Sequence, residues 1–112
     1  MTLWLALFLW TLVLELPVYA LGAAQRAGCW WHMPLVALAL NLLTHPLFTW
    51  WQYEVRPGGD TVLAAEVGIA LVEGLGLLAL RRDLGFGRAL LCSFAANGVS
   101  YGTGLLVWWL LA

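Results

Sequence analysis

Four long apolar segments fill most of this 112-residue chain and leave only short connections between them. The segments run over residues 2–21, 34–51, 61–80 and 88–111. A membrane-spanning helix needs about 20 apolar residues, so four spans use about 80 and leave too few for a second domain. The sequence therefore predicts an all-α integral membrane protein, with residues 1–112 forming a single domain of four transmembrane helices.

The composition excludes the common soluble classes. The chain is 63% hydrophobic and only 10% charged, whereas soluble domains are about half apolar and about a quarter charged. Such a chain cannot cover a water-facing surface, which excludes a soluble enzyme and a disordered chain. A net charge of −1 with no Lys argues against a nucleic-acid partner. The expected partner is the lipid bilayer, and the expected location is the inner (plasma) membrane, crossed several times.

The arginines predict how the chain is oriented. The first connection carries Arg26, and the third carries Arg81 and Arg82 and is followed at once by Arg88. The second connection carries only Arg56. The first and third connections lie on the same side of an alternating bundle, and the positive-inside rule makes that side cytoplasmic. Both termini are then expected to face outward.

The first apolar segment is expected to stay in the protein. It begins at the first residue without a basic region and contains Glu15. Both features are atypical of a cleaved signal peptide, so the segment is interpreted as a membrane span.

The second half of the chain echoes the first, which predicts an internal duplication. Each unit contains two spans, about 1–53 and about 59–112, so the two copies enter the membrane in the same direction. Such parallel repeats are related by a pseudo-two-fold axis along the membrane normal. The matched polar positions are Glu15 with Glu73, Asn41 with Asn97, Thr44 with Ser100, and His45 with Tyr101.

Polar residues inside the spans fall on one face of each helix, because their spacings follow the helical period. At 1.5 Å per residue, one polar residue of each span lies roughly 10–14 Å from the cytoplasmic end, near the middle of the bilayer. These residues are Glu15, Asn41, Glu73 and Asn97, and Glu66 lies further outward. These stripes are expected to converge in the bundle interior and to bind a ligand or ion. The candidate site residues are Glu15, Asn41, Thr44, His45, Glu66, Glu73, Asn97, Ser100 and Tyr101.

The three intramembrane acids carry most of the functional expectation. An acidic residue at a helix centre costs about 2.5–3.5 kcal/mol on insertion scales. Each acid must therefore be protonated, paired with a donor or bound to a cation. His45 with Glu residues could hold a divalent metal, but no HExxH or paired ExxH motif is present. The metal is left open, and no cofactor is expected.

Helix breakers accompany the polar residues. Pro17 and Pro46 follow Glu15 and His45, and Gly102 holds the place of Pro46 in the second half. Matched interruptions in two halves are typical of transporter binding sites. The competing interpretation of the glycines is close helix packing, since Gly98-x-x-x-Gly102 is a GxxxG motif.

Three functions compete. The favoured one is a proton- or cation-linked transporter or channel, expected to work as a homodimer because a four-helix bundle encloses little volume. The second is a structural or assembly subunit of a larger membrane complex. The third is an intramembrane enzyme with acid/base chemistry at Glu15 or Glu73; it ranks last because Ser100 and Thr44 have no placed base.

The length, the four expected spans and Glu15 in the first span resemble the small multidrug resistance transporters. The resemblance is confined to this acid. The aromatic and Gly-rich segments of that family are absent here, and its third helix carries no acids like Glu66 and Glu73. Its activity is therefore not carried over to this chain.

Overall fold

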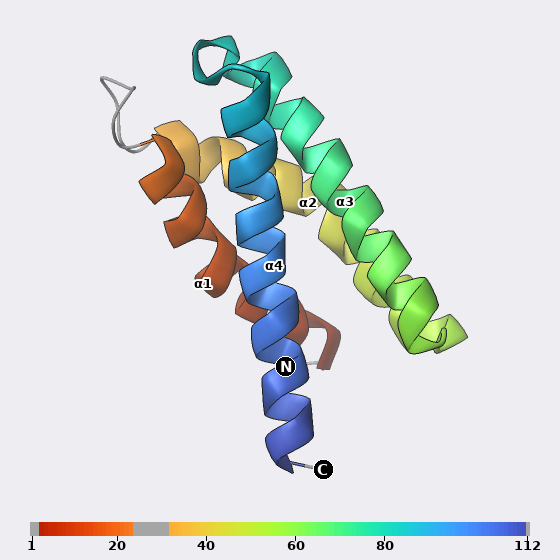
Figure 1. Ribbon diagram of the computed structural model, residues 1–112. Coiled ribbons are helices and arrows are strands. Elements are labelled where there is room, and N and C mark those ends of the chain that lie inside the picture. Colours follow the sequence, from red (N-terminus) through yellow and green to blue (C-terminus); the bar gives the residue numbers. More distant parts are fainter. Residues whose placement is uncertain (1–2, 24–31, 112) are drawn as a thin grey trace.

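The computed structural model describes residues 3–23 and 32–111, and these form four α-helices (Figure 1). The helices are α1 (Leu3–Ala23), α2 (His32–Val55), α3 (Gly59–Leu80) and α4 (Phe86–Leu111). A short 3-10 turn, η1 (Arg82–Leu84), joins α3 to α4. The all-helical class is confirmed, and the first connection with Arg26 lies outside the described residues.

Backbone conformation and hydrogen bonding end the helices at the two described turns. Arg56 has a left-handed backbone (φ 51°) and is followed by Pro57, which has no N–H to continue α2. After α3, the backbone N–H of Arg81 donates to the carbonyl of Leu77 at 2.7 Å. Gly85 then adopts φ 78°, a conformation that glycine accepts without steric cost, and the chain reverses into α4.

The four helices form an alternating antiparallel bundle. Around the bundle α1 packs against α2, α2 against α3, α3 against α4, and α4 against α1. The end of α1, the start of α2 and the α3–α4 turn lie at one end of the bundle (top of Figure 1). The start of α1, the α2–α3 turn and the end of α4 lie at the other end of the bundle. The long axis of 43 Å exceeds the roughly 30 Å hydrocarbon thickness of a bilayer.

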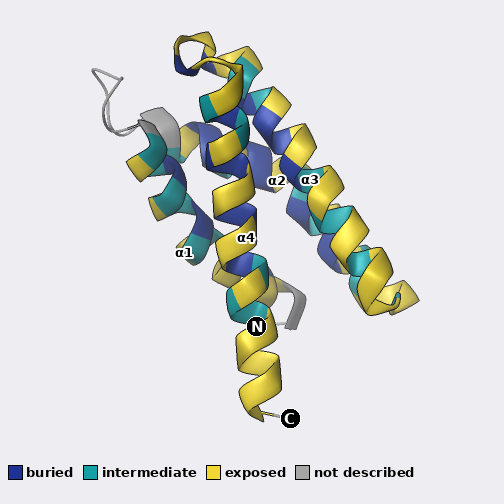
Figure 2. Cartoon of the chain, in the orientation of Figure 1, coloured by how far each residue is buried: buried dark blue, intermediate teal, exposed yellow. Residues whose placement is uncertain are grey.

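Three of the described helices are long and apolar enough to cross a membrane: α1 over Leu5–Gly22, α3 over Gly59–Leu80, and α4 over Phe86–Leu111. The outward sides of the helices are exposed (yellow in Figure 2), and many of the exposed residues are large and apolar. Water cannot stabilise such a surface, which suits a membrane location. The helix α2 is long but is not among the three, because polar residues such as Asn41, His45 and Gln52 lower its hydropathy.

The interior has two tiers. Toward the α3–α4 turn, buried apolar residues fill the space between all four helices. Toward the opposite end, a cavity of about 970 Å³ lies between the start of α1, the end of α2, the start of α3 and the end of α4. The apolar core consists of Tyr19, Val36, Ala37, Leu40, Leu77, Leu84, Ala89, Cys92 and Ala96.

Candidate functional site

Three ionisable side chains from three helices meet between the apolar core and the cavity. Glu15 comes from α1, His45 from α2 and Glu73 from α3, and their exposed fractions are 0%, 3% and 0%. His45 Nε2 lies 3.5 Å from Glu15 Oε1 and 3.4 Å from Glu73 Oε1. We refer to these residues as the Glu–His–Glu cluster.

The helical period places these residues. In α3 the buried positions are Ala70, Glu73, Gly74 and Leu77, spaced by three or four residues along one face. In α4 the polar members of the buried face are Ser93, Asn97 and Ser100. The apolar faces turn outward, so the scarce polar groups turn toward one another.

Glu73 is surrounded by neutral donors from three other helices. Tyr19 Oη and Asn97 Nδ2 each donate to Glu73 Oε2 at 2.9 Å. Thr44 Oγ1 donates to Glu73 Oε1 at 2.6 Å. These bonds satisfy acceptors of a buried carboxylate but bring no positive charge to it.

Glu15 and His45 are less completely satisfied. Ser100 Oγ donates to Glu15 Oε1 at 2.7 Å. Within the described part of the chain, Glu15 Oε2 and His45 Nε2 are buried without a hydrogen-bond partner. The imidazole nitrogen is close to both carboxylates but is not aligned for a hydrogen bond to either. The cluster therefore keeps unused ligand atoms at its centre.

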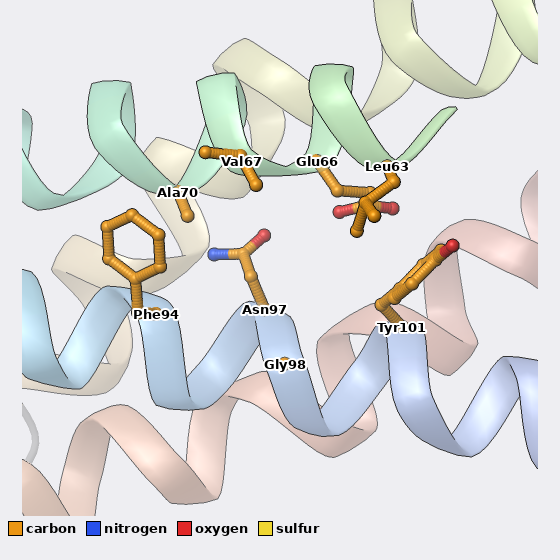
Figure 3. A pocket seen from close by; sticks show the side chains of 8 residues that line it. All are labelled: Leu63, Glu66, Val67, Ala70, Phe94, Asn97, Gly98 and Tyr101. Atoms are coloured by element: carbon orange, nitrogen blue, oxygen red, sulfur yellow. The ribbon is translucent and has the colours of Figure 1, made fainter. Parts of the chain in front are cut away.

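Asn97 has a fixed amide orientation. Its Nδ2 donates both to Glu73 Oε2 at 2.9 Å and to the Ser93 carbonyl at 3.0 Å. A flipped amide would place oxygen against these two acceptors, so the assignment is settled by the network. Asn97 Oδ1 then points toward the Glu66 side of a small cavity of about 100 Å³ (Figure 3).

The structure brings six of the nine predicted residues into one network: Glu15, Thr44, His45, Glu73, Asn97 and Ser100. Asn41 is buried, but its Nδ2 donates to the backbone of its own helix, at Ala37 O. Glu66 and Tyr101 lie outside the network and line both cavities. Both matched asparagines donate to the carbonyl four residues earlier in their own helix, and Asn97 also donates to Glu73.

Two members of the interior network lie on the polar faces predicted from the sequence but were not among the predicted site residues. Tyr19 is fully buried and donates to Glu73, while Ser93 Oγ donates to the Ala70 carbonyl at 2.6 Å. The available signal was spacing, since Tyr19 lies one turn after Glu15. A tyrosine near a helix end is more often an interfacial anchor, so spacing alone did not identify its partner.

Comparison with known protein families, curated proteins and solved structures gives no significant match for this chain.

Proposed function

We propose that this chain spans the membrane four times and moves protons or cations across it, with the Glu–His–Glu cluster as the transport site. The observation that carries this proposal is the meeting of two buried carboxylates with one imidazole. One imidazolium can balance only one carboxylate. The surrounding donors are neutral, so a proton or a bound cation is needed to remove the remaining charge.

Access to the cluster supports a transport role. His45 and Ser100 belong to the cluster network and also line the 970 Å³ cavity. Glu66 lines the same cavity nearer the α2–α3 turn. A cation that enters between the helices therefore meets Glu66 before it reaches His45. By the positive-inside rule, we propose that this end of the bundle faces outward.

The burial pattern of α2 supports the proposal that this helix also spans the membrane, together with α1, α3 and α4. Asn41 and His45 lower its hydropathy, and both are buried. On its outer face Leu42, Leu43 and Leu47 are 53%, 76% and 69% exposed. The side that would meet lipid is therefore apolar.

The internal duplication also stays a proposal. The first unit, α1 and α2, supplies Glu15, and the second unit, α3 and α4, supplies Glu73. Both acids reach the same histidine, which is what two parallel copies around a shared axis would produce.

The test is proton flux in proteoliposomes, measured with an internal pH-sensitive dye after an imposed pH jump. We expect Glu15→Gln together with Glu73→Gln to lower the protein-dependent flux at least tenfold, because a glutamine amide does not take up and release a proton near neutral pH. Glu54→Gln is the matched control, since Glu54 is exposed at the end of α2. Wild-type flux from a folded double variant would refute the proposal.

The second candidate is a structural or assembly subunit of a larger membrane complex, and one observation favours it. Gly98 and Gly102 lie one turn apart on α4, and a Cβ built at either glycine meets nothing within 4 Å. The GxxxG motif is therefore unused within the described bundle and offers a close approach to another helix.

A further inference from the structure

We propose that the cation bound by the Glu–His–Glu cluster is a divalent transition metal of the zinc class. This inference rests on the proposed function and names its substrate class. The cluster supplies one imidazole nitrogen and two carboxylate oxygens, and these ligand atoms all lie within 4.8 Å of one another.

The spacing suits a shared metal better than direct ion pairs. Zinc bonds to nitrogen and oxygen of about 2.0–2.2 Å place tetrahedral ligand atoms about 3.3–3.6 Å apart. The two carboxylate oxygens lie 3.4 and 3.5 Å from His45 Nε2. A charge-assisted hydrogen bond would be shorter, about 2.7–2.9 Å, and Nε2 makes no hydrogen bond within the described chain.

The types of ligand atom in the cluster narrow the choice of metal ion. Magnesium and calcium select sites built of oxygen ligands. A mixed set of imidazole and carboxylate suits zinc and its first-row neighbours. His45 therefore sets the preference against the two common hard cations.

The charge balance favours a divalent ion. Two carboxylates and a neutral imidazole carry a charge of −2, which a divalent cation cancels inside an apolar bundle. The side chains that hydrogen-bond to the two acids are all uncharged, and they fix the carboxylate orientations as outer-shell partners do in metal sites. These partners are Tyr19, Thr44, Asn97 and Ser100.

A fourth ligand position and an entry path are also available. Glu15 Oε2 has no hydrogen-bond partner in the described residues, so Glu15 can also supply its second oxygen. The cavity reaches His45, so water or an incoming ion has access to the nitrogen ligand. Ligand spacing, outer-shell partners and an entry path are the features expected of a usable metal site.

The experiment is a cobalt titration of the full chain in detergent, without a polyhistidine tag. Four- or five-coordinate Co²⁺ gives visible absorption bands, and we expect saturation at one ion per chain. Zinc is expected to displace cobalt, whereas magnesium is not. His45→Gln and Glu73→Gln should each weaken binding at least tenfold, and the exposed control Glu54→Gln should leave it unchanged.

A milder variant covers the case in which a ligand variant fails to fold. Ser100→Ala removes the hydroxyl that donates to Glu15 but keeps all three ligands, and it should weaken cobalt binding by about 10- to 100-fold, the range found for outer-shell partners. Cobalt affinity equal to wild type in this variant and in every folded ligand variant would overturn the metal site, as would the absence of cobalt bands in the folded wild type.

The two proposals fail separately. Acid-dependent proton flux without cobalt binding would overturn the metal inference and leave proton transport standing. Cobalt binding that depends on His45, with neither proton nor zinc flux into liposomes, would support the metal site and overturn the transport proposal.

Discussion

At the residue scale, Glu73 is the point where the four helices are joined. It lies on α3 and accepts hydrogen bonds from Tyr19 of α1, Thr44 of α2 and Asn97 of α4. In an apolar environment an unsatisfied carboxylate is costly. The bundle geometry that satisfies Glu73 is therefore favoured over arrangements that separate any of these helices.

Tyr19→Phe should destabilise the bundle by about 1.5–3 kcal/mol, the value of a hydrogen bond to a charged group. The substitution removes the 2.9 Å bond to Glu73 and keeps the buried ring, so it leaves almost no cavity. Thermal or denaturant unfolding in micelles measures the change.

Thr103→Val is the control for this prediction, because Thr103 Oγ1 donates only to the Val99 carbonyl of its own helix. We expect Thr103→Val to lower the free energy of unfolding by less than about 0.5 kcal/mol, as for most surface changes. Equal effects of the two variants would contradict the interhelical role of Tyr19.

The sequence predicted which polar residues turn inward but not how they pair. Stripes at helical spacing identified Glu15, His45 and Glu73, because polar groups avoid lipid. The choice of partners depends on the rotation and depth of each helix, which a single sequence does not encode locally. Asn97 and Asn41 both donate to carbonyls of their own helices, but Asn97 also reaches Glu73.

At the element scale, α3 packs tightly against α4 at Gly74, where the absence of a side chain leaves room for the neighbouring helix. A Cβ at Gly74 would lie 2.6 Å from Leu90 Cδ2 and 3.4 Å from Ser93 Cβ. The Ser93 hydroxyl bridges to the Ala70 carbonyl beside this contact. Small residues thus permit the approach that aligns Asn97 with Glu73.

Gly74→Leu should separate α3 from α4 and destabilise the protein by about 1–3 kcal/mol, as overpacking does. Gly98→Leu is the matched control on the facing helix, because a Cβ there meets nothing within 4 Å. It should leave the unfolding midpoint of the monomer nearly unchanged.

The same pair also tests whether the GxxxG face joins two copies of the chain in a homodimer. In that case, chemical cross-linking in membranes should lose its dimer band in Gly98→Leu. An unchanged dimer band would exclude that face, and equal destabilisation by both variants would contradict the described helix contact.

The helix positions were predicted closely, and the differences have a local cause. The second span was expected to end at Trp51, where polar residues begin, but α2 continues to Val55. Hydrogen bonding along a helix does not depend on apolar side chains. The helix ends only where Arg56 adopts a left-handed conformation before Pro57.

At the scale of the whole molecule, the arginine bias predicts which end faces outward, and two exposed glycines make this measurable. Gly58 lies in the α2–α3 turn and Gly87 at the start of α4, and a Cβ at either position meets nothing within 4 Å. In a background with Cys29→Ala and Cys92→Ala, each glycine can be replaced by cysteine.

An impermeant maleimide applied to intact cells should label Gly58→Cys and should label Gly87→Cys only after lysis. The reverse pattern would invert the proposed orientation. Labelling of both in intact cells would refute a bundle that crosses the membrane between these turns.

The two-tier interior has an electrical consequence. The cavity leads to the Glu–His–Glu cluster from one end, whereas packed apolar side chains close the other end. Under the proposed orientation in the membrane, a proton that reaches the cluster from the cavity crosses only part of the voltage drop. Full passage of one charge is worth about 2.3 kcal/mol per 100 mV, so arrival at mid-depth is worth about half of that. The resting potential of the cell would then set how often the site is filled, even when the concentrations on both sides are constant.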